Sequence, residues 1–520
     1  MNRPVEHSHI FKDYKLRAAW SSSCGLRNRG ATPPPSVPTL KQVTSTGSLP
    51  FALHSDFATA LPELAAPGHG ERQPDPQVAL LNEPLCEFLG LDPNWLRSAQ
   101  GVQFLLGNAN PEDQPPVAMA YSGFQFGQLS PVLGDGRAFL LGEIATSAGL
   151  RDLHVKGSGP TAFSRPGSDG RGTLGSMLRE YVVSRKLAEL GVPTTEPLAV
   201  VSTGRAVVRD RGLPGGVVVR VAASHLRVGS FHYAQLHGGE ELTAQLADYA
   251  IGRHFPQLAD EDDPAARYRG LFDSVMDAQI PTVSRWQQLG FIHGVMNTDN
   301  TSISGETIDY GPCAFMEGFD PDTVFSSIDT RGRYRYGNQP LILGWNLARL
   351  AESLLPLLGS TPDAALEWAQ KAINGFIDRF NEHYWSSTAR DILGIDATGH
   401  TAQEWVDGYF AELRSAGTDI TLANRAVWEA ARGDGTRLDA LLPASEWVAR
   451  WREHTPTEPG KRAPLSIPRN RPLDAALEAA HAGDLGPIRE IDAASVYDFH
   501  PELSEPDPDG LQGFRTFCGT

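Results

Sequence analysis

One stretch, Phe291–Met316, constrains the fold of this chain more than any other part of its sequence; it reads FIHGVMNTDNTSISGETIDYGPCAFM. Apolar residues begin and end it, and polar turn residues between them include Asn300 and Asp309. An amide oxygen and a carboxylate are hard ligands, which suit a divalent cation that bridges nucleotide phosphates. Thr-Asp-Asn and Ser-Gly are also ordinary turn residues, so either half alone is equally compatible with a plain loop. Taken together, the two halves favour a metal site.

The same stretch partly matches H-R-D-L-x-x-x-N, the catalytic-loop pattern of phosphotransferases. His293 and Asn300 match its first and last positions. Val295 stands where the pattern has its catalytic aspartate, and the nearest carboxylate is Asp299. Ile308–Gly311 reads Ile-Asp-Tyr-Gly and resembles the D-F-G step, a metal-binding carboxylate at the end of an apolar strand. The pattern predicts a kinase-like metal site whose base lies elsewhere.

Composition excludes several classes of protein. The 520 residues carry a formal net charge of −17, which argues against a nucleic-acid binder. The best candidate for a membrane span, Leu341–Leu358, contains Asn346, Arg349 and Glu352 and therefore predicts a buried helix. The four cysteines show neither C-x-x-C nor zinc-type spacing, so a reducing, cytoplasmic location fits.

The two ends of the chain differ from its middle. Residues 1–48 are rich in Pro and Ser, with more basic than acidic residues, and predict a disordered basic extension. An organelle transit peptide is the alternative, although no clean amphipathic helix is visible. Residues 456–520 predict a C-terminal extension with one helix near Leu473–Ala482, an acidic tail and a terminal Cys518.

Between these extensions, the pattern changes from helices to strands and back to helices. Residues 49–115 predict helices, one of them at Val78–Asn82 and another at Leu85–Gly90. Residues 116–237 predict a small sheet, because short apolar runs are bounded by glycines. Residues 238–455 predict a series of helices. Their approximate spans are Glu241–Phe255, Ala265–Leu289, Leu341–Leu357, Asp363–Tyr384, Ala402–Ser415 and Leu422–Arg432. Sheet first and helices afterwards indicate an α+β, bilobal, kinase-like architecture.

The predicted sheet contains candidate phosphate contacts. Gly134 and Gly136 precede Arg137 at a turn between strands, where backbone N–H groups could approach phosphate oxygens; a plain hairpin turn is the alternative. Lys156 closes the next strand, and Glu180, on a helix predicted over Leu174–Leu190, could pair with it as in kinases.

Two further features could contact a nucleotide or another anion. Asp169 and Gly170 lie in a second polar glycine turn that could contact a nucleotide. Arg220 and Arg227 are seven positions apart and would share a face if their segment is helical. Two arginines on one face suit an anionic ligand, whereas surface salt bridges are the alternative.

The combination of motifs resembles the selenoprotein O family of kinase-like protein adenylyltransferases over nearly the whole chain from about residue 48. The residues that carry this resemblance are Tyr121–Gly127, Leu133–Arg137, His154–Gly159, Ser224–Arg227, His293–Asn300, Asp309–Pro312, Pro468–Asn470 and Cys518.

The resemblance implies a pseudokinase fold that transfers AMP from ATP to protein Ser, Thr or Tyr hydroxyls and releases pyrophosphate. It implies that Asp299 accepts the hydroxyl proton, that Asn300 and Asp309 hold Mg²⁺ or Mn²⁺, and that Glu180 positions Lys156. The implied nucleotide contacts are Gly134, Gly136, Arg137, Lys156, Asp169, Gly170, Arg220, Arg227 and Asp309. Self-AMPylation is a further implied activity.

This chain departs from the family pattern at several positions. The turn at Ser168–Gly170 is one residue longer than the family's usual turn, and Gly175 stands where arginine is common. Cys518 matches a redox position of the family, but Ser326 and Ser327 stand where a second cysteine is usual, and Cys313 is the remaining candidate. A phosphotransferase and an inactive nucleotide-binding pseudokinase are the alternative functions.

Overall fold

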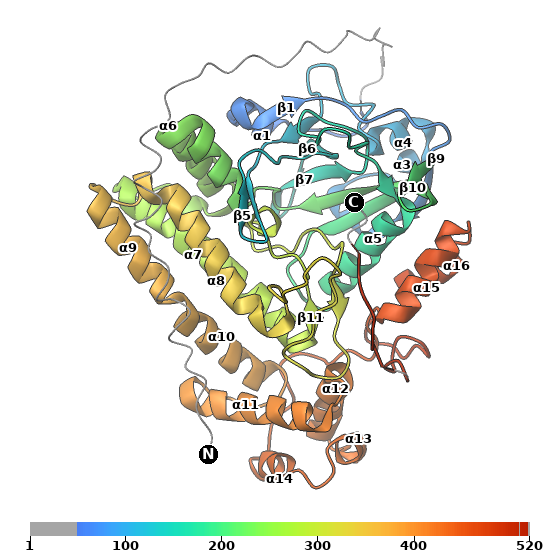
Figure 1. Cartoon of the computed structure of the whole chain (residues 1–520), viewed down its shortest axis with the longest axis vertical. Helices are drawn as coiled ribbons and strands as arrows, with labels where there is room; N and C mark the ends of the chain where they lie inside the picture. The colour runs from blue at the N-terminus through green and yellow to red at the C-terminus, as the bar shows by residue number, and fades with distance from the viewer. Residues whose placement is uncertain (1–48, 509, 518–520) are drawn as a thin grey trace. The chain divides into compact units, whose positions relative to one another are not determined.

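The computed structural model describes residues 49–508 and 510–517, a mixed α/β structure in which one antiparallel sheet is followed by many helices (Figure 1). The expected disordered extension at residues 1–48, with its possible targeting role, lies outside the described residues, as does Cys518. No helix within the described ranges is long and apolar enough to cross a membrane.

Antiparallel pairing joins every pair of neighbouring strands in the main sheet, whose order is β1-β3-β6-β7-β10-β9-β2, with β8 beside β10. The strands of the structure are β1 (Ala65–Pro67), β2 (Gln77–Leu81), β3 (Val117–Met119), β4 (Gly123–Gln125), β5 (Gln128–Ser130), β6 (Ala138–Thr146), β7 (Gly149–Lys156), β8 (Gly172–Thr173), β9 (Glu196–Val208), β10 (Gly212–Ala222), β11 (Phe291–Ile292) and β12 (Ala314–Phe315).

The helices include short N-terminal ones, a long central set and two at the C-terminal end (Figure 1). They are α1 (Asp56–Ala60), α2 (Glu83–Leu89), α3 (Pro93–Arg97), α4 (Ala99–Leu105), α5 (Leu174–Glu189), α6 (Val228–His254), α7 (Pro264–Leu289), α8 (Gln339–Leu354), α9 (Pro362–Asn374), α10 (Phe376–Asp391), α11 (Gly399–Ala416), α12 (Ile420–Ala431), α13 (Thr436–Leu441), α14 (Glu446–Glu453), α15 (Asn470–His481) and α16 (Gly486–Ala493).

Both faces of the sheet are buried, because successive side chains of a strand point to opposite sides. On β10, Val217 and Val219 belong to a core cluster with α2 and α4, whereas Val218 belongs to a cluster with α5, α6 and α7. This explains the unbroken Val-Val-Val run of β10, which is typical of a strand covered on both faces. A third cluster forms among α10–α14.

Several local predictions are wrong. Val78–Asn82 was expected to be helical but forms β2, which pairs with β9, so residues 49–115 also contribute strands to the sheet. The segment from Arg220 to Arg227 is not one helix, because Arg220 lies on β10 and Arg227 is the N-cap of α6. The predicted helix Asp363–Tyr384 is two helices that meet at Gly375.

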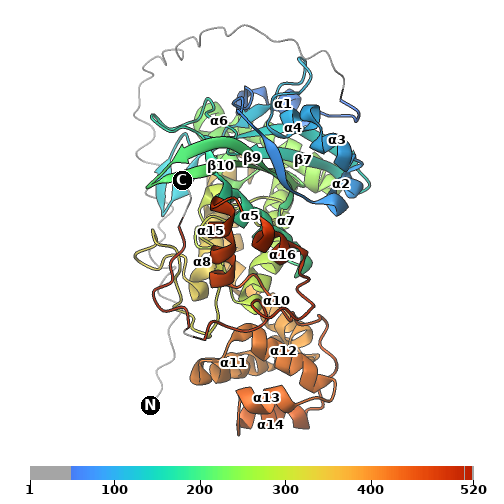
Figure 2. The ribbon, with the colours of Figure 1, turned by 90° about the vertical axis from the view of Figure 1, so that its right-hand side faces the viewer.

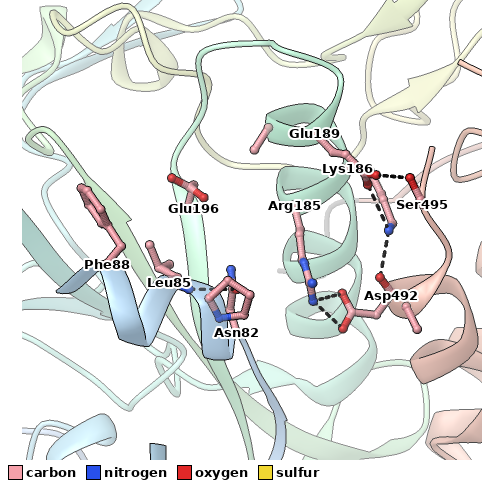
Figure 3. A pocket seen from close by; sticks show the side chains of 12 residues that line it. Asn82, Leu85, Phe88, Arg185, Lys186, Glu189, Glu196, Asp492 and Ser495 are labelled. Carbon is pink, nitrogen blue, oxygen red and sulfur yellow. Dashed lines mark hydrogen bonds and ion pairs between the residues drawn. The ribbon is translucent and has the colours of Figure 1, made fainter. Parts of the chain in front are cut away.

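The C-terminal helices α15 and α16 pack against α5 (Figure 2). A pocket of about 480 Å³ lies between α2, α5 and α16. At its rim Arg185 of α5 forms an ion pair with Asp492 of α16 at 2.7 Å, and Lys186 donates to the Asp492 carbonyl at 2.8 Å (Figure 3). The last part of the chain is therefore bound to the helix that carries Glu180.

Candidate active site

A small hairpin closes the stretch Phe291–Met316. Strands β11 and β12 pair antiparallel, with Phe291 opposite Phe315, so the polar residues between them form one loop cluster. The expected strand before Asp309 is absent from this described segment, which instead makes isolated bridges at Ser302 and Thr307. The hairpin fixes where the loop cluster begins and ends.

His293 braces this loop cluster from inside the core. Its side chain is fully buried and stacks on Trp286. The Val295 N–H donates to Nδ1 of His293 at 3.3 Å, so Nε2 carries the proton and donates to the Ile308 carbonyl at 2.9 Å. This histidine therefore connects the first loop to the residue that precedes Asp309.

Four charged side chains meet where β7, α5 and β10 face the loop cluster. Lys156 Nζ lies 2.9 Å from Glu180 Oε2 and also contacts Asp309 Oδ1. Arg220 contacts Glu180 Oε1 and lies 3.1 Å from Asp309 Oδ1. The structure thus brings together Lys156, Glu180, Arg220 and Asp309, which are far apart in the sequence.

These contacts set the charge state of the two carboxylates. Burial alone would raise the pKa of Glu180, but Arg220 and Lys156 outweigh it and lower that pKa to about 2. Burial likewise opposes the charge on Asp309, yet Lys156, Arg220 and Arg137 hold its pKa well below the usual range. Both groups are ionised at neutral pH, and Arg137 lies close enough to act on Asp309.

Asp309 has an unusual backbone conformation. Its φ of 72° lies in the left-handed region, which a non-glycine residue adopts at a cost of about 1 kcal/mol or more. Its side chain is 35% exposed, in contrast to the 4% of Glu180. The strained turn thus presents this carboxylate partly toward solvent, where a ligand could reach it.

Asp299 has the opposite electrostatic surroundings. It is buried on a short turn, Thr298–Asn300, and no hydrogen-bond partner for its Oδ1 exists among the described residues. Desolvation raises its pKa to about 6, an effect that nearby Asp309 reinforces and Arg227 opposes. Asp299 is therefore a stronger base than an ordinary aspartate.

Asn300 and Asp309 supply oxygen donors of the kind that Mg²⁺ prefers. The Asn300 amide donates from Nδ2 to the Val295 carbonyl at 3.0 Å, which leaves its amide oxygen as the acceptor for a ligand. Within the described part of the chain, no group of three or more His, Cys, Asp and Glu side chains could hold a metal. One carboxylate and one amide fit a magnesium ion that takes its remaining ligands from phosphates and water.

Arg227 lies beside this cluster and is engaged by protein groups. Its guanidinium donates to the Asp299 carbonyl at 3.0 Å, lies 3.5 Å from Asp135 Oδ1 and stacks on Tyr121. It therefore connects the Asp299 turn to the loop that precedes β6. Although Arg220 and Arg227 do not share a helix, both reach the same cluster, one from a strand and the other from a helix N-terminus.

The glycines at 134 and 136 lie in the loop before β6, which is not a hairpin turn. The N–H of Gly134 donates to the Tyr121 carbonyl, and that of Gly136 donates to the Gly134 carbonyl, both at 2.9 Å. A Cβ on Gly134 would come within 2.3 Å of the Phe163 ring. The need for glycine here comes from close packing against Phe163, and the two N–H groups already have protein acceptors.

Asp169 and Gly170 lie apart from the charged cluster. Asp169 pairs with Arg209 at 3.1 Å, and the Gly170 carbonyl accepts the Gly159 N–H at 3.1 Å. None of the contacts of Asp169 described here involves Lys156 or Asp309. The loop from Gly157 to Gly170 nevertheless starts directly after Lys156.

The cysteines in the described residues are structural. Cys86 and Cys313 are buried and free, and burial raises the pKa of the Cys313 thiol to about 12. Its thiolate, the reactive form, is therefore scarce at neutral pH. The Sγ of Cys313 donates to the Tyr310 carbonyl at 3.3 Å.

Sequence reasoning did not single out a buried polar network next to the cluster. Asp135 accepts from His154 at 2.9 Å, His154 stacks on His225 at 4.2 Å, and His225 lies 3.1 Å from Asp152. Through Asp135 this network contacts Arg227. The motifs Leu133–Arg137, His154–Gly159 and Ser224–Arg227 contain Asp135, His154 and His225, but a lone histidine in a sequence pattern does not disclose its partner.

Comparisons with known proteins identify the family of this chain. A profile of the family described as "Protein adenylyltransferase SelO" matches residues 55–423. "Protein nucleotidyltransferase YdiU" of Corynebacterium efficiens is 50% identical over 500 residues, which cover 92% of this chain and 99% of that protein. The protein of the same name from Pseudarthrobacter chlorophenolicus is 48% identical, with 92% of this chain and all of that protein covered. The chain belongs to the SelO family and is a nucleotidyltransferase.

Proposed function

We propose that this chain transfers AMP from ATP to Ser, Thr or Tyr hydroxyls of proteins, with release of pyrophosphate, in a bilobal kinase-like fold. One observation supports the proposal most: Asp309 contacts Lys156 and Arg220, whereas Asp299 in the same loop cluster is buried and its Oδ1 has no hydrogen-bond partner among the described residues. Burial raises the pKa of Asp299 to about 6, whereas Lys156 and Arg220 keep Asp309 ionised. Such a divergent pair separates an acid–base group from a charge-binding group.

In this mechanism Asp299 accepts the proton of the substrate hydroxyl. The hydroxyl oxygen forms a bond to the α-phosphorus, the bond from that phosphorus to the bridging oxygen breaks, and pyrophosphate leaves. A base with a pKa near 6 is ionised at pH 7 and still takes a proton more readily than an ordinary aspartate. The Oδ1 of Asp299 suits this role because it has no hydrogen-bond partner among the described residues.

The cations around Asp309 would offset the negative charge of the phosphates. Lys156, Arg137 and Arg220 converge on Asp309, and Glu180 holds Lys156 and Arg220 in place. Fixed cations in a buried site stabilise developing charge without reorganising. The proposed nucleotide contacts also include Gly134, Gly136, Arg227, Asp169 and Gly170, with Asp169 and Gly170 at the outer end of the loop after Lys156.

Asn300 and Asp309 would hold the Mg²⁺ or Mn²⁺ ion. When bound, the ion would neutralise phosphate charge and help orient the α-phosphorus. Asp309 is suited to this because it is ionised and 35% exposed, and the Asn300 side chain is fixed by its bond to the Val295 carbonyl.

Mass spectrometry of proteins incubated with this chain, ATP and Mg²⁺ tests the proposal. The expected result is an AMP adduct on Ser, Thr or Tyr of a partner or of the chain itself, absent with Asp309→Ala. A phosphate adduct would show a phosphotransferase instead. Binding of ATP without any adduct would show a scaffold.

A further inference from the structure

The hairpin formed by β4 and β5 has no part in the proposed chemistry, yet it is bonded to the catalytic turn. The Phe124 N–H donates to Thr298 Oγ1 at 2.8 Å, and the Phe126 N–H donates to Asn297 Oδ1 at 3.0 Å. Gly123 lies against Asp299, where a Cβ would come within 2.5 Å of Oδ1. The hairpin therefore forms a wall beside the proposed base.

The hairpin and the loop that follows it carry exposed apolar side chains. Phe126 is 36% exposed, Leu129 43% and Val132 50%. Exposed apolar side chains that gather in one place mark interaction sites more often than singly scattered ones do. They lie within ten residues of Gly123, which contacts Asp299, whereas other exposed apolar residues, such as Val208 on β9, do not.

The residues of the hairpin turn do not suit its backbone conformation. Phe126 has a φ of 51° and Gly127 a φ of 85°, and a two-residue turn with both φ values positive prefers Asn-Gly. A bulky phenylalanine in the left-handed region is strained. Its ring contacts Tyr334 at 5.1 Å and remains partly exposed. The residue suits a contact surface better than it suits the turn.

Arginines without a carboxylate partner border the apolar side chains. Arg165 donates to Gln125 Oε1 at 2.9 Å, and Arg333 stacks over Trp345 at 4.8 Å. Neither forms an ion pair with any described residue. In a chain whose net charge is −17, this local positive border is complementary to an acidic partner. Arginine and aromatic side chains are also the types enriched at protein interfaces.

We propose that the hairpin surface, defined as Phe126, Leu129, Val132, Arg165 and Arg333, binds the segment of the protein substrate that flanks its hydroxyl. The bound segment of the substrate has an apolar side chain that packs on Leu129 and Val132. It also has a carboxylate that pairs with Arg333 or Arg165. This inference rests on the proposed function, because it places the segment next to Asp299.

Peptide binding tests the inference without requiring transfer. The probes are fluorescein-labelled peptides with one central Ser, flanked by Leu and Glu in the first, by Leu and Lys in the second, and by Ser and Glu in the third. Fluorescence polarisation should show that the wild-type chain binds the first peptide at least tenfold more tightly than the other two. Leu129→Ser should abolish the preference for Leu, and Arg333→Gln the preference for Glu.

Two controls keep the result specific. Val208→Ser removes an exposed apolar side chain elsewhere, and Arg450→Gln removes an arginine stacked on Trp405 at 4.3 Å. Both should bind the peptides as the wild-type chain does. Each variant should melt at the temperature of the wild-type chain. Its affinity for a fluorescent ATP analogue should stay within twofold of the wild-type value. These two results show that the variant is folded.

Three results would overturn the inference. The first is equal binding of all three peptides, and the second is an unchanged preference in Leu129→Ser and Arg333→Gln. The third is a wild-type chain that sediments as a dimer while these two variants sediment as monomers, because the surface would then bind a second copy of the chain. Failure of the proposed function is a separate outcome. If no protein acquires AMP but the preferences hold, the surface stands and the transfer reaction does not.

Discussion

At the scale of single residues, the site depends on two aspartates in one loop cluster with different surroundings. Asp299 is buried and its Oδ1 has no hydrogen-bond partner within the described ranges, whereas Asp309 contacts two cations, Lys156 and Arg220. Each difference can be tested by a substitution that keeps the shape of the side chain.

Asp299→Asn should lower the rate of transfer at least about 100-fold, because general-base catalysis typically contributes that much or more. The same change should raise the melting temperature at pH 7. Burial raises the pKa of Asp299 from 3.8 to about 6, so the folded chain loses stability as the pH rises from about 4 to 6, and this loss is complete at pH 7. The pKa shift is about two units, and at about 1.4 kcal/mol per unit the gain should be about 3 kcal/mol.

The matched control for this substitution is Asp322→Asn, whose side chain is 69% exposed. It should change neither rate nor stability. A variant Asp299→Asn that melts lower and still transfers AMP would contradict the assignment of the base.

The pH dependence of the rate follows from the same residue. Asp299 must be ionised to accept a proton, so the rate should rise as the pH increases toward about 6 and level off above 7. Steady-state rates between pH 5 and 8 measure this, with circular dichroism to confirm that the chain stays folded. A flat profile over that range would assign the proton to another group.

At the scale of elements, β7 and α5 bring Lys156 and Glu180 together, and β10 adds Arg220. Glu180 is nearly fully buried, and its low pKa means that the pairing stabilises the fold above about pH 4 and is lost as the pH falls toward 2. A buried ion pair of this kind is costly to break from one side, because the remaining charges stay buried.

Glu180→Gln should therefore destabilise the chain by about 3 kcal/mol and weaken ATP binding, since Lys156 and Arg220 lose their common partner. Chemical denaturation and a nucleotide-binding assay measure the two effects. Glu478→Gln is the matched control, because Glu478 is 59% exposed in its ion pair with Arg211 and should cost less than about 1 kcal/mol. Equal losses in both variants would show that the buried cluster has no special role.

The sequence predicted α5, the strand that ends at Lys156 and the helices α7, α8, α11 and α12, because apolar spacing and capping residues determine these locally. It did not predict β2, since Val-Ala-Leu-Leu fits a helix or a strand and only pairing with β9 decides. Nor could spacing show that Arg220 and Arg227 meet near Asp309 from different elements. The orphan Oδ1 of Asp299 and the stacked histidines depend on long-range packing that no local pattern encodes.

At the scale of the whole molecule, the C-terminal segment holds together parts of the site. α16 binds α5 through Asp492, and Asn470 at the start of α15 exchanges hydrogen bonds with the backbone of Phe315 in β12, at 3.2 and 2.7 Å. The segment thus contacts both the helix that carries Glu180 and the hairpin that closes the Asp309 loop.

Asn470→Ala should destabilise the chain by about 1–3 kcal/mol, because it leaves a buried N–H and a buried carbonyl of Phe315 without partners. Thermal unfolding measures the effect. Asn374→Ala, an exposed position at the end of α9, should have little effect. No difference between the two would mean that the C-terminal segment does not support the hairpin.

The central claim is that this kinase-like site transfers AMP. Parallel reactions with ATP labelled at the α- or the γ-phosphate, each with Mg²⁺, test it most directly. The account predicts label on protein only from the α position, and none with Asp309→Ala or Asp299→Asn. Label that arrives from the γ position would contradict it.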